Sequence, residues 1–124
     1  MEKESINEET DKEIAEDAKQ SPAGDSFELG GNIVLKGFRD IDRANMVIVK
    51  KMVGSYARRM TDLSPKFESL TLDLKKIHET EKSEKYEVQA KLINDGKPMN
   101  SSSLERNIFF AIDRALGKIV SELE

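Results

Sequence analysis

The chain has 124 residues, of which 35% are charged and 37% hydrophobic, with a formal net charge of −4 and no cysteine. This length predicts one small domain. The lack of cysteine excludes disulfides, thiolate catalysis and cysteine-ligated zinc, and no apolar run approaches the roughly 18 residues of a membrane-spanning helix. Because the N-terminus is also too acidic for a secretory or organelle signal, these features favour a cytoplasmic protein without a membrane partner.

Charge is distributed unevenly along the chain. Residues 1–29 contain ten acidic residues and three lysines, a net charge of −7, whereas residues 30–124 contain 17 Lys or Arg and 14 Asp or Glu, a net charge of +3. Residues 1–26 have too few large apolar side chains to offset their ordering entropy. We therefore expect a disordered acidic tail over residues 1–26 and a folded domain over residues 27–124. The tail either acts as a passive solubiliser or competes with a polyanion for the basic domain.

The folded part is predicted to begin with a strand and a long helix. A β-prone run bounded by glycines indicates a first strand over Asn32–Phe38. A helix capped by Asp40 or Asp42 should follow, and Pro65 should end it. The core stripe predicted for this helix, at helical spacing, consists of Asn45, Ile48, Val49, Met52, Val53, Tyr56 and Met60.

Two alternating segments follow the helix. Residues 67–80 and 85–93 each alternate apolar and polar side chains, which indicates half-buried strands. The polar sequence HETEKSE, residues 78–84, is expected to form a flexible loop between them. Asn94–Gly96 predicts a tight turn into a short fourth strand, residues 97–103. One of Ser101–Ser103 is expected to cap a last amphipathic helix within residues 106–124.

The predicted order is β-α-β-β-β-α. A mostly antiparallel sheet with one apolar face needs cover on that face, and the two amphipathic helices can supply it. The expected fold is therefore α+β, a two-layer sandwich with both helices on one face of the sheet.

The outer side of the first predicted helix is basic. Arg43, Lys50, Lys51 and Arg58 fall within an arc of about 100°, and no acidic residue lies between Arg43 and Arg59. A merely solvated face commonly mixes both signs of charge. The pattern therefore favours an RNA partner held through its phosphates and its shape, and a solvated face without a partner is the alternative.

Other residues are candidates to extend this surface. The strand hairpin contributes lysines, although interleaved glutamates weaken its field, and the last helix contributes basic residues that would join the surface if the two helices lie side by side. Phe110 falls on the outer face of the last helix, among arginines, where it could stack on an unpaired base, anchor a protein or pack against a neighbouring element. The predicted RNA-contacting residues are Arg43, Lys50, Lys51, Arg58, Lys75, Lys76, Arg106, Phe110, Arg114 and Lys118.

No catalytic or metal-binding motif is found. His78 is the only histidine, so neither a histidine-based metal cluster nor a catalytic triad can form around it. No phosphate-binding loop or nucleophile elbow occurs either. We therefore expect a non-enzymatic protein with no cofactor, no metal and no small-molecule substrate.

The last helix and the order of elements resemble the ribosome hibernation-promoting factor family, also called ribosome-associated inhibitors. That family has a sulfur or aromatic pair followed by Ala-Ala-Ile-Asp and then leucines and basic residues, and this chain has IFFAID at residues 108–113. The resemblance covers about residues 31–123, including the first strand and helix and the two alternating strands. Two departures, Phe110 in place of the usual alanine and KPMNSSSLE in place of a histidine-alanine-serine-alanine strand, fit a short, divergent or archaeal-type member.

The resemblance implies a double-stranded-RNA-binding-like fold and a specific role. Members of the family bind the small ribosomal subunit where mRNA and tRNAs pass, which represses translation and protects idle ribosomes under stress. The expected partners are therefore the small ribosomal subunit and its rRNA. The alternative is a protein-interaction or self-association module on the same fold, such as a weak homodimer.

Overall fold

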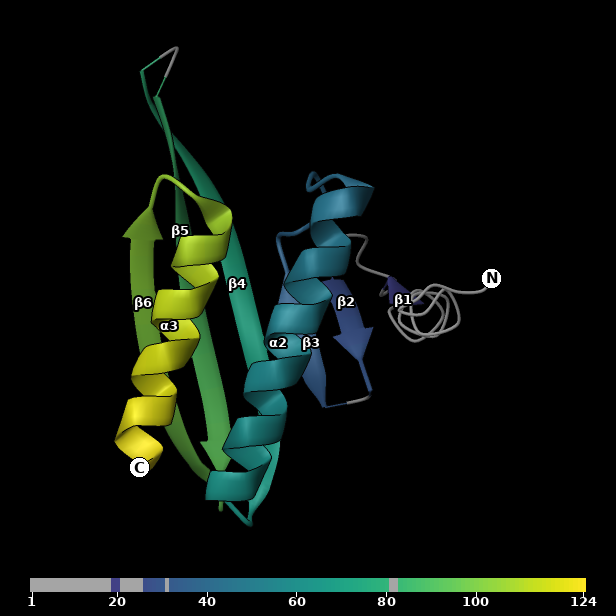
Figure 1. Cartoon of the computed structure of the whole chain (residues 1–124), viewed down its shortest axis with the longest axis vertical. Helices are drawn as coiled ribbons and strands as arrows, with labels where there is room; N and C mark the ends of the chain where they lie inside the picture. Colours follow the sequence, from purple (N-terminus) through teal and green to yellow (C-terminus); the bar gives the residue numbers. More distant parts are fainter. Residues whose placement is uncertain (1–18, 21–25, 31, 81–82) are drawn as a thin grey trace.

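The computed structural model describes residues 19–20, 26–30, 32–80 and 83–124. Most of the predicted acidic tail, residues 1–26, therefore lies outside the described residues. The elements, numbered as in Figure 1, are β1 (Lys19–Gln20), β2 (Ser26–Leu29), β3 (Ile33–Lys36), α2 (Arg43–Leu63), β4 (Phe67–Thr80), β5 (Ser83–Asn94), β6 (Lys97–Glu105) and α3 (Ile108–Leu123).

The strands form one mixed sheet in the order β1-β2-β3-β4-β5-β6. β3 and β4 pair in parallel because α2 crosses over between them, and the other neighbouring strands pair in antiparallel fashion. Both helices lie side by side on the same face of the sheet (Figure 1). The predicted two-layer α+β sandwich is confirmed. Two short strands, β1 and β2, precede the predicted first strand and were not expected, because four residues with two apolar side chains give little periodic signal.

The start and end of α2 follow the sequence closely. Asp42 is the N-cap, and its Oδ1 accepts a hydrogen bond from the Asn45 N–H at 2.8 Å. The helix ends at Leu63, two residues before Pro65, as expected for a residue that cannot donate the next hydrogen bond.

The inward face of α2 differs from the predicted stripe, because Met46 and Ala57 are buried although they were not predicted, and Ile48 is not buried. Ile48 was expected in the core, and this was wrong, because its side chain is 46% exposed. The buried face is centred on Val49 and Val53, which lie about 100° and about 140° around the helix from Ile48. The buried residues of α2 are Met46, Val49, Val53, Ala57 and Met60.

β4 and β5 form a long hairpin that projects beyond both helices (Figure 1). The predicted flexible loop over residues 78–84 was wrong in extent, because His78 pairs with Glu84 in the strand ladder. The two strands therefore continue past the core, where their paired residues are polar. An antiparallel pair of strands can extend into solvent in this way when cross-strand polar side chains stabilise it. Residues 81–82 at the tip lie outside the described residues.

The predicted tight turn between β5 and β6 is confirmed. Asp95 has φ 56° and Gly96 has φ 76°. Two successive residues with positive φ are the signature of a type I′ turn, which matches the twist of an antiparallel pair.

The N-cap of α3 was predicted incorrectly. The cap is Asn107, whose Oδ1 accepts hydrogen bonds from the N–H groups of Phe109 and Phe110 at 2.8 and 3.1 Å. The expected caps, Ser101–Ser103, lie within β6 because the backbone stays extended as far as Glu105.

Two of these serines instead fasten α3 to the sheet. Ser101 Oγ donates to the carbonyl of Ala115 at 2.6 Å, and Ser103 Oγ donates to the carbonyl of Ala111 at 2.5 Å. The donors are two residues apart on a strand and the acceptors four apart on a helix, so each pair lies on one face of its element. The serines therefore fix the position of α3 along β6.

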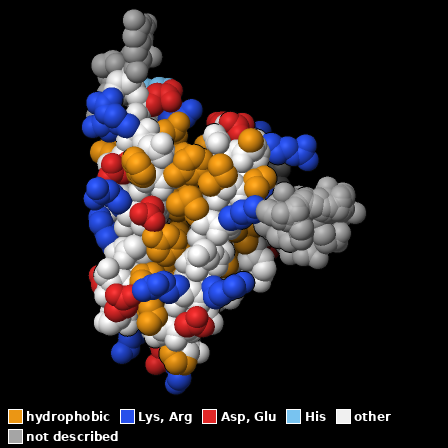
Figure 2. Space-filling model, viewed as in Figure 1, with side chains coloured by type: hydrophobic (Ala, Val, Ile, Leu, Met, Phe, Trp, Pro, Cys, Tyr) orange, Lys and Arg blue, Asp and Glu red, His pale blue; other side chains and the backbone are white. Residues whose placement is uncertain are grey.

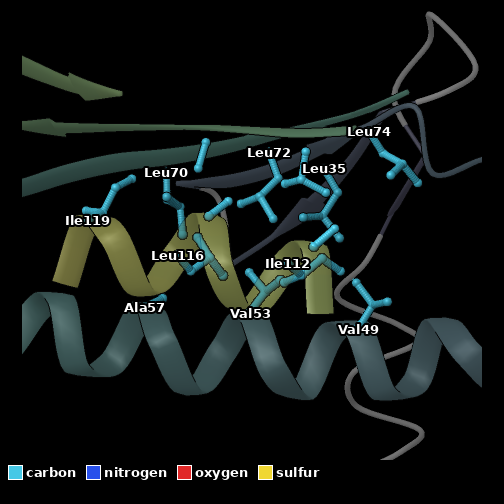
Figure 3. Close-up of a cluster of buried hydrophobic side chains, with 14 of the residues drawn as sticks. Leu35, Val49, Val53, Ala57, Leu70, Leu72, Leu74, Ile112, Leu116 and Ile119 are labelled. Carbon is cyan, nitrogen blue, oxygen red and sulfur yellow. The ribbon is translucent and has the colours of Figure 1, made fainter. Parts of the chain in front are cut away.

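The core lies between the two helices and one face of the sheet. Figure 3 shows side chains from the strands and from both helices pointing toward one another. Burying a side chain such as Leu, Ile or Val contributes about 1.5–3 kcal/mol, so this layer is the main source of stability. Neither of the described helices combines the length and the apolar character needed to cross a bilayer. The labelled core residues are Leu35, Val49, Val53, Ala57, Leu70, Leu72, Leu74, Ile112, Leu116 and Ile119.

Gly37 provides a test of the close approach between the end of β3 and β4. Its φ is +81°, and a Cβ there would overlap the carbonyl oxygen of Leu74. Gly37→Ala should lower the free energy of unfolding by about 2–4 kcal/mol, from backbone strain and from steric overlap together. Urea denaturation of the variant and the wild type measures this difference.

Gly96→Ala is the matched control. Gly96 has a similar φ of +76°, but an added Cβ would meet no atom within 4 Å. It should cost only the strain of a left-handed alanine, about 1–2 kcal/mol. Equal losses in the two variants would show that the contact with Leu74 does not constrain Gly37.

Candidate nucleic-acid interface

The basic arc predicted on α2 faces away from the core. Arg43, Lys51 and Arg58 are exposed and Lys50 is half-buried. We refer to these four residues as the α2 ridge. Neither Arg43 nor Arg58 has an ion-pair partner among the described residues. The two arginines therefore keep their charge available to a ligand.

Three residues of the α2 ridge meet in one hollow. Lys50, Lys51 and Arg58 line a space of about 400 Å³ between α2 and the turn from β2 to β3. We call this space the α2–β3 hollow. The structure thus brings together predicted cations that are eight residues apart in sequence. The other lining residues, which sequence analysis did not assign to a site, are Leu29, Gly30, Ile33, Gly54 and Ser55.

The environment of Lys50 is unfavourable for its positive charge. Partial burial lowers the pKa of its ammonium group from the usual value of 10.5, and the nearby charge of Arg43 lowers this pKa further. Desolvation and a like charge both disfavour the protonated form. An anion bound beside Lys50 would offset both effects.

A second hollow lies on the other side of the ridge. It has a volume of about 730 Å³ and runs between the C-terminal halves of α2 and α3. Ser55 and Arg58 line both hollows. Arg59 lies in the second one, where its Nη2 contacts Glu124 Oε2 at 2.6 Å. Arg58 therefore stands between two depressions, whereas Arg59 is already paired.

The cations of α3 do not join the α2 ridge. Arg114 Nε lies 3.0 Å from Glu105 Oε2, and Lys118 Nζ donates to the carbonyl of Ser102 at 2.6 Å. Both partners belong to β6, on the side of α3 away from α2. The helices do lie side by side, but the two basic sets point to opposite flanks, and Figure 2 shows Lys and Arg on either side of a central hydrophobic band.

The remaining predicted cations lie on or near the β4–β5 hairpin. Lys76 Nζ is 3.9 Å from Glu84 Oε1 and 6.0 Å from the centre of the Tyr86 ring. Lys75 is exposed on the opposite face of β4. Arg106 precedes α3, and its Nη1 donates a hydrogen bond of 3.3 Å to the Oγ of Ser83, the first residue of β5. These three residues lie apart from the α2 ridge, and the charge of Lys76 is partly neutralised by Glu84.

Phe110 is exposed, as the sequence predicts. Its side chain is 64% accessible, the largest value among the exposed large hydrophobic residues described. It borders a shallow depression shared with Glu105, Asp113 and Arg114. Phe110 therefore lies beside the Glu105–Arg114 ion pair, on the α3 side of the molecule and not in the α2–β3 hollow.

A hydrogen bond joins the two helices across their seam. Tyr56 on α2 donates its hydroxyl proton to Asp113 Oδ1 on α3 at 2.5 Å. Burial raises the pKa of Tyr56 to about 12, and the hydrogen bond to Asp113 contributes to the rise.

Comparison with family models and with curated proteins identifies no relative. No family model matches the chain, and a search of curated proteins finds no significant match. The likeness to ribosome hibernation factors therefore rests on the sequence motifs alone. The function has to be argued from the surface itself.

Tyr56→Phe tests the link between the helices. The variant should lose about 0.5–1.5 kcal/mol of unfolding free energy at neutral pH, because it removes the hydrogen bond from the half-buried Tyr56 to the exposed Asp113. Urea denaturation measures this loss, and Tyr86→Phe controls for the removal of a tyrosine hydroxyl.

The same variant should change the response to alkaline pH. A raised pKa means that the folded state keeps the Tyr56 proton while the unfolded state loses it above about pH 10. Wild-type stability should therefore fall between about pH 10 and about pH 12 by more than that of Tyr56→Phe. Parallel stability profiles for the two proteins over this range would contradict the assignment.

Proposed function

We propose that this protein is a non-enzymatic, cytoplasmic RNA-binding factor of the ribosome hibernation type. It occupies the tRNA and mRNA path of the small ribosomal subunit, and so represses translation or protects idle ribosomes. The observation that carries the proposal is the α2 ridge, a set of cations on one rigid helix with no acidic residue among them.

The ridge has the chemistry that RNA phosphates require. Each Lys or Arg that contacts a phosphate releases condensed counterions, and this gives affinity without reading a base. Structured RNA is recognised largely through shape and backbone, so a spaced row of cations is sufficient. Action by occupancy needs only such a surface.

Sequence likeness supports the ribosome as the source of the RNA. The IFFAID segment at residues 108–113 and the order of helices and strands resemble the hibernation factors. The exposed Phe110 suits a partner that offers unpaired bases or an apolar protein surface, both of which occur on a ribosome.

Self-association is the second candidate, and two observations favour it. β6 is an edge strand of the sheet, and Phe110 and Leu104 are exposed near it, at 64% and 49%. Edge strands and exposed apolar side chains both promote pairing with another chain. Against pairing, Lys118 occupies the Ser102 carbonyl on this strand, and a lysine at an edge opposes strand addition.

Co-sedimentation with purified ribosomes and separated subunits tests the proposal. Lys50→Glu/Arg58→Glu reverses two charges of the ridge. Lys91→Glu/Lys97→Glu makes the same change in charge at exposed positions on β5 and β6, and it is the matched control. Circular dichroism confirms that each variant is folded.

The wild type should bind small subunits with an affinity that falls as salt rises. The ridge variant should bind at least about tenfold more weakly, and the slope of log K against log salt should lose about 2, since two phosphate contacts are removed. The control should stay close to the wild type. A folded wild type that binds no ribosomal particle at any salt, or a control as weak as the ridge variant, would overturn the proposal.

Phe110→Ala tests the aromatic contact separately. Stacking on an unpaired base should make its loss cost about 1–3 kcal/mol of binding free energy with little change in salt slope. Ile48→Ala is the control for another exposed apolar side chain. Sedimentation equilibrium measures self-association. A dimerisation constant that does not change with salt concentration, and self-association that is lost in Phe110→Ala, would favour the second candidate.

A further inference from the structure

The α2–β3 hollow contains apolar side chains as well as the cations that would bind a phosphate. Leu29 and Ile33 contribute apolar side chains from the sheet, and Lys50 and Arg58 contribute cations from α2. Among the residues that the structure describes, no acidic one lines it. Pockets that hold small ligands have volumes of about 300–1,000 Å³ and combine apolar walls with a few polar groups. The hollow, at about 400 Å³, falls in this range.

Apolar and cationic groups are placed on different walls. The paired positions Leu29 and Ile33 lie on the same face of β2 and β3, the face toward the helices. Lys50, Ser55 and Arg58 come from the facing helix. A ligand that fits both walls carries a negative group joined to an apolar body.

Gly54 leaves the helix side of the hollow without a side chain. A Cβ added there would meet no atom within 4 Å, so packing does not require a glycine. In a helix interior, glycine costs about 1 kcal/mol relative to alanine. The space that Gly54 leaves open lies between Lys50 and Arg58, where a planar ring could lie against the helix backbone.

We propose that the α2–β3 hollow binds a nucleotide, with its base against Leu29, Ile33 and Gly54 and its phosphate held by Lys50 and Arg58. The inference deepens the proposed function, because on a ribosome the occupant is an unpaired nucleotide of the RNA. A free mononucleotide presents the same chemistry. The half-buried ammonium of Lys50, beside Arg43, gains a counter-charge when the phosphate binds.

Amide chemical-shift titration of the ¹⁵N-labelled full-length chain at low salt tests the site. The ligands are AMP, inorganic phosphate, adenosine and a short oligoadenylate. AMP or the oligonucleotide should produce saturable shifts at the amides of Leu29, Gly30 and Gly54, with an affinity about tenfold above that for phosphate or adenosine. Saturation by AMP identifies a site for free nucleotides, and saturation by the oligonucleotide alone identifies a site for RNA.

Gly54→Leu fills the hollow without weakening the helix. Leucine has a higher helix propensity than glycine, so the variant should be at least as stable as the wild type. It should bind the nucleotide about tenfold more weakly or not at all. Ala44→Leu enlarges an exposed side chain elsewhere on α2 and should bind like the wild type.

Three results would overturn the inference: phosphate binding as tightly as AMP and the oligonucleotide, no saturable shifts at these amides with either nucleotide ligand, or undiminished binding to Gly54→Leu. The ribosome experiment separates this failure from failure of the proposed function. If the wild type co-sediments with ribosomes but binds no nucleotide in the hollow, only the proposed nucleotide site is refuted. If the protein binds nucleotide saturably but does not co-sediment with ribosomes, only the proposed ribosomal role is refuted.

Discussion

Leucine side chains from three adjacent strands project from one face of the sheet, and their burial is the constraint that organises the molecule. Leu35, Leu70, Leu72 and Leu92 are fully buried, whereas the opposite face carries residues such as Asp73 and Lys91. A face of this kind is stable only when it is covered. The parallel pairing of β3 and β4 sends α2 across this face, and α3 covers the part that α2 leaves open.

Covering one face with two helices determines what their outer sides can do. Ser101 and Ser103 fix α3 along β6, and the Tyr56–Asp113 hydrogen bond fixes α2 against α3. With the helices held in this way, Arg114 forms an ion pair with Glu105 on β6, and Lys118 donates a hydrogen bond to the Ser102 carbonyl on the same strand. The cations of α2 point to the other flank, where the described part of the sheet offers Leu29 and Ile33 rather than carboxylates.

The molecule therefore presents two outward surfaces with different chemistry. The α2 flank has cations beside an apolar hollow, which suits an anion that carries a ring. The α3 flank has an exposed phenylalanine beside an ion pair, which suits stacking or a protein contact. Half-burial of Lys50 next to Arg43 is costly for the free protein, and such costs are typical of surfaces whose ligand supplies the missing charge.

Several features follow from local sequence alone. The Asp42 cap, the helix end before Pro65, the turn at Asp95–Gly96 and the alternating leucines of β4 depend on neighbouring residues, so their chemistry predicts them. The basic arc and the exposed position of Phe110 also follow, because helical spacing fixes which side chains share a face.

Other features were decided only by the tertiary structure. Which side of a helix is buried depends on where the helix meets the sheet, so Met46, which was not predicted, lies in the core and Ile48 does not. Ser101 and Ser103 were expected at a helix cap but bond the side of α3, because the strand continues past them. The α2–β3 hollow is lined by residues of β2, β3 and α2. The periodicity of a single helix or strand cannot indicate that Leu29 and Arg58 lie on facing walls, because they belong to different elements. Sequence thus determined the local elements and their charges, and packing of distant segments determined which of those charges meet in a site.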